Sequence, residues 1–180
     1  MKRTVWLWEL CGFAAVSLVG TLLHFLYDWS GKSPWIASFS GVNESTWEHM
    51  KLLFWPILGY AAFQSLFFNG YENFWWVKLR GTLLGLALIP ILFYTYNGVI
   101  GKSPDFVNIA IFFISAAAVF IYETLAIYRG KGTRHSPKTA IALLSVIAAL
   151  FIIFTFLPPS LGIFKDPLTG GYGILKNGGC

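Results

Sequence analysis

The sequence has little charge and few cysteines, and both shortages restrict the kind of protein it encodes. Only 12% of its 180 residues are charged, about half the share of an ordinary soluble domain, so polar side chains are too few to cover a soluble surface. The two cysteines, Cys11 and Cys180, exclude a disulfide scaffold. Apolar residues make up 56% of the chain and fall in long blocks. Each block is near the roughly 20 residues that cross a bilayer core, which predicts an integral membrane protein.

Signatures of common catalytic and nucleotide sites are also missing. There is no phosphate-binding glycine loop, no Gly-x-Ser-x-Gly elbow, no His-Glu-x-x-His and no paired Cys-x-x-Cys. The basic segment Arg129–His135 lies between two apolar blocks, where contact with anionic lipid headgroups explains it better than nucleic acid does. We therefore expect the lipid bilayer as a partner and no nucleic acid.

Five apolar blocks predict an all-α fold, an integral membrane bundle of five transmembrane helices. Backbone groups in lipid need partners within their own segment, which a helix supplies. The first block is too long for a signal-peptide core and contains Glu9, so we expect it to be retained. The predicted bounds are Val5–Tyr27, Trp47–Phe68, Phe74–Tyr96, Asp105–Tyr128 and Lys138–Leu157.

The prolines and glycines after the fifth block divide the chain into two predicted parts. Residues 1–157 form the transmembrane domain, and residues 158–180 form a tail. The tail starts with Pro158-Pro159 and is too rich in glycine to be a helix. We expect it to lie outside the cell, where it can fold over the outer mouth of the bundle.

Basic residues set the predicted orientation of the bundle. Eight lysines and arginines, including all four arginines, fall on the side of the N-terminus, and five lysines fall on the other side. The positive-inside rule therefore places the N-terminus in the cytoplasm and the C-terminus outside. Tryptophans cluster at both predicted interfaces, as indole rings do in membrane proteins.

Ionisable residues inside the apolar blocks need a reason, because charge is expensive in a membrane. Two acids lie about one turn inside the predicted inner interface, at the level where two basic residues begin the third block. These residues are Glu9, Glu123, Lys78 and Arg80. The favoured interpretation is structural ion pairing that orients the helices. The alternative is a proton or cation relay.

A larger set of polar residues is expected near the outer surface, where it forms a candidate ligand-binding site. Its members are His24, Asp28, Asn43, Glu44, His49, Tyr94, Asn97, Asn108 and Asp166. Three of them, His24, Glu44 and His49, have the side chains that bind a zinc-type divalent metal, with one position left for water. Part of the pattern also fits a purely structural role, because Ser45 and Glu48 form a capping box at a helix start.

Three segments of the sequence carry a resemblance to a known family. They are Leu23–Gly31, Val42–Lys51, and Phe164–Gly170 with Tyr172-Gly173. The chain resembles a family of small bacterial multi-pass membrane proteins of unknown function. The resemblance implies a bacterial, Gram-positive-type source and a plasma-membrane location, and it carries no activity with it.

Three functional classes fit these observations. The leading hypothesis is a protein that binds or transports a small polar solute or ion through the outward-facing polar pocket. The second is a membrane-embedded hydrolase with a metal held by His24, Glu44 and His49, although binding is favoured over catalysis. The third is a non-catalytic subunit or assembly factor of a membrane complex. Gly81-x-x-x-Gly85 permits close helix packing, which makes a homo-oligomer a further possibility.

Overall fold

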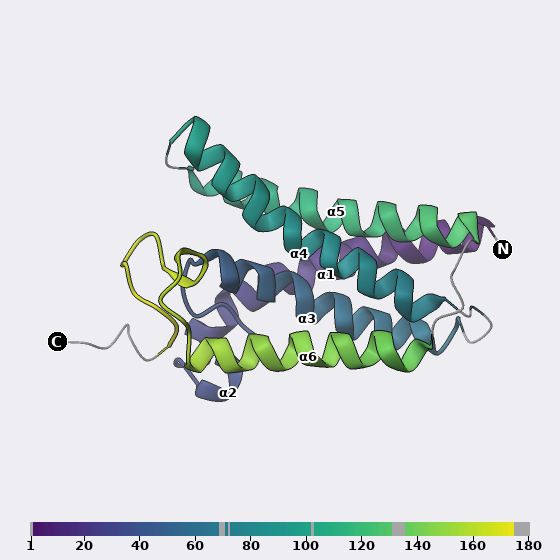
Figure 1. Cartoon of the computed structure of the whole chain (residues 1–180), viewed down its shortest axis with the longest axis horizontal. Coiled ribbons are helices and arrows are strands. Elements are labelled where there is room, and N and C mark those ends of the chain that lie inside the picture. The colour runs from purple at the N-terminus through teal and green to yellow at the C-terminus, as the bar shows by residue number, and fades with distance from the viewer. Residues whose placement is uncertain (1, 69–70, 72, 102, 131–135, 175–180) are drawn as a thin grey trace.

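The computed structural model describes residues 2–68, 71, 73–101, 103–130 and 136–174. This part of the chain holds six α-helices and one short 3-10 helix (Figure 1). Their bounds are α1 Lys2–Trp29, α2 Pro34–Ala37, α3 Thr46–Ser65, α4 Phe74–Val99, α5 Asp105–Arg129, α6 Pro137–Phe156 and η1 Gly162–Phe164. The predicted all-α fold is confirmed, with a long helix at each of the five predicted blocks, although only four of these helices among the described residues are suited to cross a membrane; the one-turn helix α2 is an addition.

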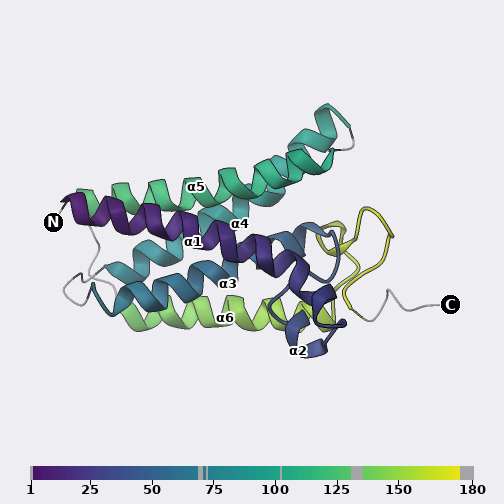
Figure 2. The ribbon, with the colours of Figure 1, turned by 180° about the vertical axis from the view of Figure 1, so that it is seen from behind.

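The long helices run up and down along one axis, and the start of α1 and the described part of the tail lie at opposite ends (Figures 1 and 2). One end carries the start of α1 and the end of α5. The other end carries α2, the α4–α5 connection and the tail. Local sequence explains several of the boundaries. Pro34 and Pro137 occupy the first turns of their helices, and Gly130 ends α5 in the left-handed conformation at φ 59°.

Four helices are long and apolar enough to cross a membrane: α1 from Thr4 onward, α4, α5 and α6. The helix α3 does not belong to this group. It contains Glu48, Lys51 and Gln64, yet it is the central helix, because it contacts α1, α4, α5, α6 and η1. Half of its 20 residues are buried. The most polar of the long helices is therefore shielded by the more apolar ones.

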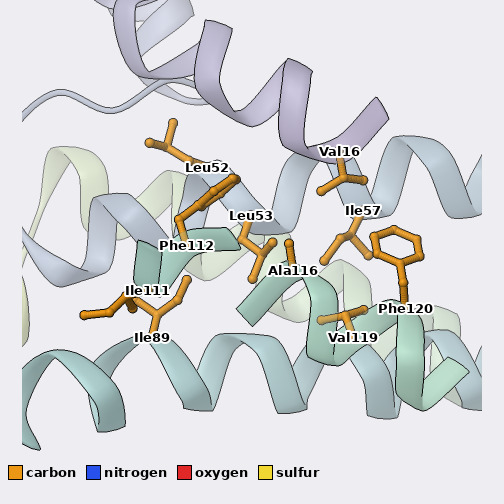
Figure 3. Close-up of a cluster of buried hydrophobic side chains, with 10 residues drawn as sticks. All are labelled: Val16, Leu52, Leu53, Ile57, Ile89, Ile111, Phe112, Ala116, Val119 and Phe120. Atoms are coloured by element: carbon orange, nitrogen blue, oxygen red, sulfur yellow. The ribbon is translucent and has the colours of Figure 1, made fainter. Parts of the chain in front are cut away.

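Tightly packed apolar side chains join α3 to its neighbours. One cluster connects α1, α3, α4 and α5 (Figure 3); its members are Val16, Leu52, Leu53, Ile57, Ile89, Ile111, Phe112, Ala116, Val119 and Phe120. A second joins α3 and α4 to α6; its members are Phe54, Leu79, Leu86, Ala140, Leu144 and Phe151. Between membrane helices such contacts act through close packing, since lipid tails are as apolar as leucine.

Glycines allow the closest approach of α4 to α5. A Cβ added at Gly85 would lie 2.5 Å from Val119 Cγ2, and one at Gly81 would lie 2.7 Å from Glu123 Oε1. Both glycines of the small-residue motif are thus used within this chain. The motif accordingly provides no evidence for a homo-oligomer.

The end of the α4–α5 pair leaves the bundle. Pro90 lies inside α4, where it removes a helical hydrogen bond and bends the helix. The buried residues of α4 end at Ile89, and those of α5 begin at Ile111. Beyond these points the two helices diverge from α1, α3 and α6 (Figure 1), and Val99 and Phe106 are mostly exposed.

The described part of the tail folds back on the ends of α3 and α6. Phe164 of η1 is buried, with its ring centroid 4.7 Å from that of Trp47 and 5.3 Å from that of Phe154. Farther along, the Ile174 amide donates to the Thr155 carbonyl at 3.1 Å. The tail therefore covers the same end of the bundle that carries α2.

Candidate functional site

Three of the predicted ligand residues meet at the end of the bundle that carries α2. His24 comes from α1, Glu44 from the loop before α3, and His49 from the first turns of α3. Glu44 lies between the two rings, with Oε1 3.5 Å from His24 Nε2 and Oε2 3.5 Å from His49 Nε2. One ligand atom from each residue lies within 4.8 Å of the other two.

A network of turn hydrogen bonds places Glu44 between the histidines. Asn43 Oδ1 accepts from the Ser45 amide at 2.9 Å, and Ser45 Oγ accepts from the Glu48 amide at 3.4 Å as the N-cap of α3. The same loop is joined to α1 through Ser40, whose hydroxyl donates to the Leu23 carbonyl and accepts from the Tyr27 amide. The loop is thus held against the helix that carries His24.

The hydrogen bond at His49 decides which ring nitrogen faces the carboxylate. Its Nδ1 lies 3.0 Å from the Ser45 carbonyl oxygen. A carbonyl only accepts, so a hydrogen bond there is donated by Nδ1. The other ring nitrogen, Nε2, lies 3.5 Å from Glu44 Oε2, beyond the usual range of a hydrogen bond. In the neutral tautomer that carries its proton on Nδ1, Nε2 is free to bind a cation.

The chemistry of the three groups fits a zinc-type cation. Two imidazoles and a carboxylate are a ligand set known for zinc, and ligand distances of 2.0–2.2 Å place neighbouring ligand atoms about 3.4 Å apart. The two 3.5 Å separations involve different oxygens of Glu44, and one ligand atom from each residue lies within 4.8 Å of the other two, so small side-chain shifts would bring all three onto one ion. The side chains are 20–38% exposed, which leaves the fourth position open to water. A backbone carbonyl on Nδ1 is also the usual second partner of a metal-bound histidine.

A small cavity adjoins the three-residue site. It has a volume of about 20 Å³ and is lined by His49, Thr46, Asn108 and apolar residues of α4 and α5. This space holds about one water molecule. Asn108 thus lies near the site without joining it.

The other predicted ligand residues are not brought to the site. Asn97 and Asn108 form a separate network with Ser103 that closes the α4–α5 connection. Tyr94 is 45% exposed on the part of α4 that leaves the bundle. Asp166 stabilises a turn of the tail by accepting from the Leu168 amide and the Thr169 hydroxyl.

Two more of the predicted ligand residues, Asn43 and Asp28, lie close in sequence to the three-residue site without joining it. Asn43 is used in the turn before α3, and Asp28 is exposed one turn beyond His24. The nine predicted residues therefore do not all lie together, because residues at one depth can still point in different directions around the bundle.

A buried ion pair lies next to the site. Lys51 and Glu48 are both almost fully buried, and Lys51 Nζ lies 2.6 Å from Glu48 Oε2. The ammonium also donates to the Ala37 carbonyl at 2.7 Å and to Thr155 Oγ1 at 2.8 Å. The spacing of Glu48 and Lys51 suits an i, i+3 pair, but the contacts with α2 and α6 have no sequence signal.

A second buried charge cluster lies near the other end of the bundle. Lys78 Nζ is 2.5 Å from Glu123 Oε2 and 3.3 Å from Glu9 Oε2. Gln64 adds a hydrogen bond of 2.8 Å to Glu9 Oε1. Arg80, which was grouped with these residues, is instead exposed with its guanidinium over the Trp76 ring. Lys78 and Arg80 are two positions apart on a helix and therefore face different ways.

Comparison with known proteins identifies the family and no activity. The model of a family of unknown function, DUF6512, matches residues 2–174. No curated protein and no solved structure matches the chain. Four helices suited to crossing a membrane make this a multi-pass membrane protein, which agrees with the expected resemblance to membrane proteins of unknown function. Since the match covers nearly the whole sequence, the chain belongs to the DUF6512 family.

Proposed function

We propose that this membrane protein binds a divalent transition-metal ion, of the zinc type, through His24, Glu44 and His49. The observation that carries the proposal is the position of His49. Its Nδ1 is engaged with the Ser45 carbonyl, so Nε2 is the ring nitrogen turned toward Glu44, at 3.5 Å. A carboxylate between two imidazole rings, one of them oriented by a backbone carbonyl, is an arrangement suited to a metal cation.

The size of the neighbouring space favours an ion over a larger solute. The cavity beside His49 measures about 20 Å³, which is room for a water molecule and not for an organic solute. A metal-activated hydrolase remains a second candidate, because the partial exposure of all three ligands leaves space for a metal-bound water.

The proposed orientation places this site on the outer face of a bacterial plasma membrane. We include α3 as a fifth span, because it runs alongside the four apolar helices (Figure 2). The excess of lysine and arginine at the end that carries the N-terminus supports a cytoplasmic location for that end. The opposite end, with α2 and the tail, would then face the outside.

Cysteine labelling of intact cells tests the orientation. In a background with Cys11 and Cys180 replaced by serine, we expect a membrane-impermeant thiol reagent to label Leu168→Cys and to spare Ser136→Cys. Both positions are exposed. The reverse pattern would place the metal site in the cytoplasm.

Metal binding is tested by titrating the purified, metal-stripped protein with Zn²⁺ in a calorimeter. We expect about one equivalent to bind, and we expect His49→Ala or Glu44→Gln to weaken binding by more than tenfold, because each removes a ligand. Binding should also weaken on acidification, since protons compete for the imidazoles.

The control for this titration is His135→Ala, which removes the remaining histidine of the chain at a position outside the described residues. It should bind Zn²⁺ as the unaltered protein does. Substoichiometric binding by the unaltered protein, or equal binding by His49→Ala, would contradict the proposal.

A further inference from the structure

The strongest unexplained feature is the cluster at the end of the bundle opposite the metal site. It joins α1, α3, α4 and α5 through Glu9, Gln64, Lys78 and Glu123, and each of these side chains is at most 2% exposed. Glu9 is seven residues beyond the start of α1, about 10 Å along the helix. The cluster is therefore well inside the apolar part of the bundle.

The charges of the cluster do not balance. Lys78 supplies one ammonium, and Glu9 and Glu123 supply two carboxyl groups that both contact it. Gln64 contributes a neutral amide. If both carboxyl groups were ionised, the site would hold one uncompensated negative charge in a nearly dry environment, which is strongly unfavourable.

Aromatic rings surround the amino group of Lys78. Its ammonium lies 5.5 Å from the ring centroid of Phe74, 5.7 Å from that of Phe120 and 5.9 Å from that of Tyr60. Ring faces attract a cation at these distances. If Lys78 lost its proton, both carboxylates would be left without a counter-charge. The net charge of the cluster is therefore brought to zero by adding a proton to one carboxyl group.

One oxygen of the cluster is available for that proton. Among the described residues, Glu123 Oε1 has no hydrogen-bond partner, although it is fully buried. Its other oxygen receives the short contact from Lys78. A buried carboxylate oxygen without a donor is costly, and protonation at this carboxyl group removes the excess charge.

The other titratable side chains near the pair do not supply the missing positive charge. On α3, the Tyr60 hydroxyl donates to the Trp8 carbonyl at 2.5 Å. On α1, the thiol of Cys11 is exposed. On α4 and α5, the groups that face the pair are Lys78 and Glu123 themselves.

A groove between α1 and α5 leads to the cluster. It has a volume of about 370 Å³, and Glu9 is the one ionisable residue that lines it; the remaining lining is mainly apolar, with Trp6 and Thr124 toward the nearer end of the bundle. Glu9 is thus the member of the cluster that lies beside a surface groove.

From this geometry we propose that Glu9 and Glu123 form a proton-binding site, in which the two carboxyl groups share one exchangeable proton beside the charged Lys78. The ligand is a proton, taken up at a carboxylate oxygen and released as the surroundings become alkaline. This site is separate from the metal site, because it lies at the other end of α1 and α3.

Infrared spectroscopy of the purified full-length protein tests the proposal, because a protonated carboxyl group has its own C=O stretching band. We expect such a band at neutral pH and its loss under alkaline conditions. Glu123→Gln should abolish the band, since Glu9 and Lys78 then form a balanced pair. Asp105→Asn, which changes an exposed acid, should leave the band unchanged.

The lysine provides a second arm of the test. Lys78→Met leaves two buried carboxyl groups without a cation, so both should bind protons and the band should roughly double. Absence of the band from the unaltered protein at neutral pH would overturn the proposal, and this measurement does not depend on whether a variant folds. Persistence of the band in both Glu9→Gln and Glu123→Gln would also overturn it.

Discussion

Two lysines are buried among the residues that the structure describes, Lys51 and Lys78, and their surroundings differ in one decisive respect. Lys51 has one carboxylate, one backbone carbonyl and one hydroxyl around its ammonium, so its three protons and its charge are all matched. Lys78 has two carboxylates and a cage of aromatic rings, so negative charge is in excess. The balanced lysine suits a permanent structural link. The two carboxyl groups at the unbalanced lysine suit a site that takes up and releases a proton on a carboxyl oxygen.

Replacing a glutamate partner of each lysine by glutamine should therefore affect stability unequally. Glu48→Gln removes the only carboxylate that contacts Lys51 among the described residues and leaves a buried cation unpaired. We expect it to lower the free energy of unfolding by about 3–5 kcal/mol, measured by thermal or denaturant unfolding in detergent. The double variant Glu48→Gln, Lys51→Met should recover much of the loss. A loss below about 1 kcal/mol for the single variant would contradict the structural role.

A smaller effect is expected where Lys51 loses a neutral partner. Thr155→Val keeps the shape of the side chain but removes the hydroxyl that accepts from Lys51 at 2.8 Å. Since hydrogen bonds to charged groups are worth about 1.5–3 kcal/mol, we expect a loss of about 2 kcal/mol. Thr139→Val is the matched control, because Thr139 is an exposed residue of the same helix. Equal stability of the two variants would show that α6 is not held through Lys51.

The smallest effect is expected at the unbalanced cluster. Glu123→Gln preserves an oxygen for Lys78 and leaves the neutral pair Lys78 and Glu9, so at neutral pH stability should change by less than about 1 kcal/mol. On raising the pH, the unaltered protein should lose stability as its folded state gives up the shared proton, whereas the variant should change less. Parallel pH profiles for the two proteins would remove the distinction between the lysines.

Sequence patterns located the long helices well because their signal is local. Long apolar blocks with few charges predicted α4 from Phe74 and α5 from Asp105, and both helices begin at those residues. The helix α3 was also predicted, even though its polar residues keep it out of the group suited to span a membrane. Its central position in the bundle, in contrast, came from the structure and was not predicted from the sequence.

Which side chains meet at the site was harder to predict, because this depends on the direction in which each side chain points around the bundle as well as on its position along the bundle axis. His24, Glu44 and His49 meet because the turn at Asn43 and Ser45 orients the loop. Tyr94 and Asn97 are at a similar depth, but they follow Pro90 on a helix that diverges from the others. The partners of Lys51 were hidden for another reason: a backbone carbonyl carries no signal in a sequence, and Thr155 is 104 positions away.

That separation has a consequence for how the protein is made. When α3 leaves the ribosome, Glu48 is already present to pair with Lys51, but the hydroxyl that completes the ammonium belongs to α6 and is synthesised 104 residues later. Until then the central helix carries an unsatisfied donor on the surface that α6 will cover. Assembly of the bundle therefore finishes only when α6, the last long helix, packs against α3. A nascent chain released before α6 would leave α3, its most polar long helix, without the contacts that α6 supplies.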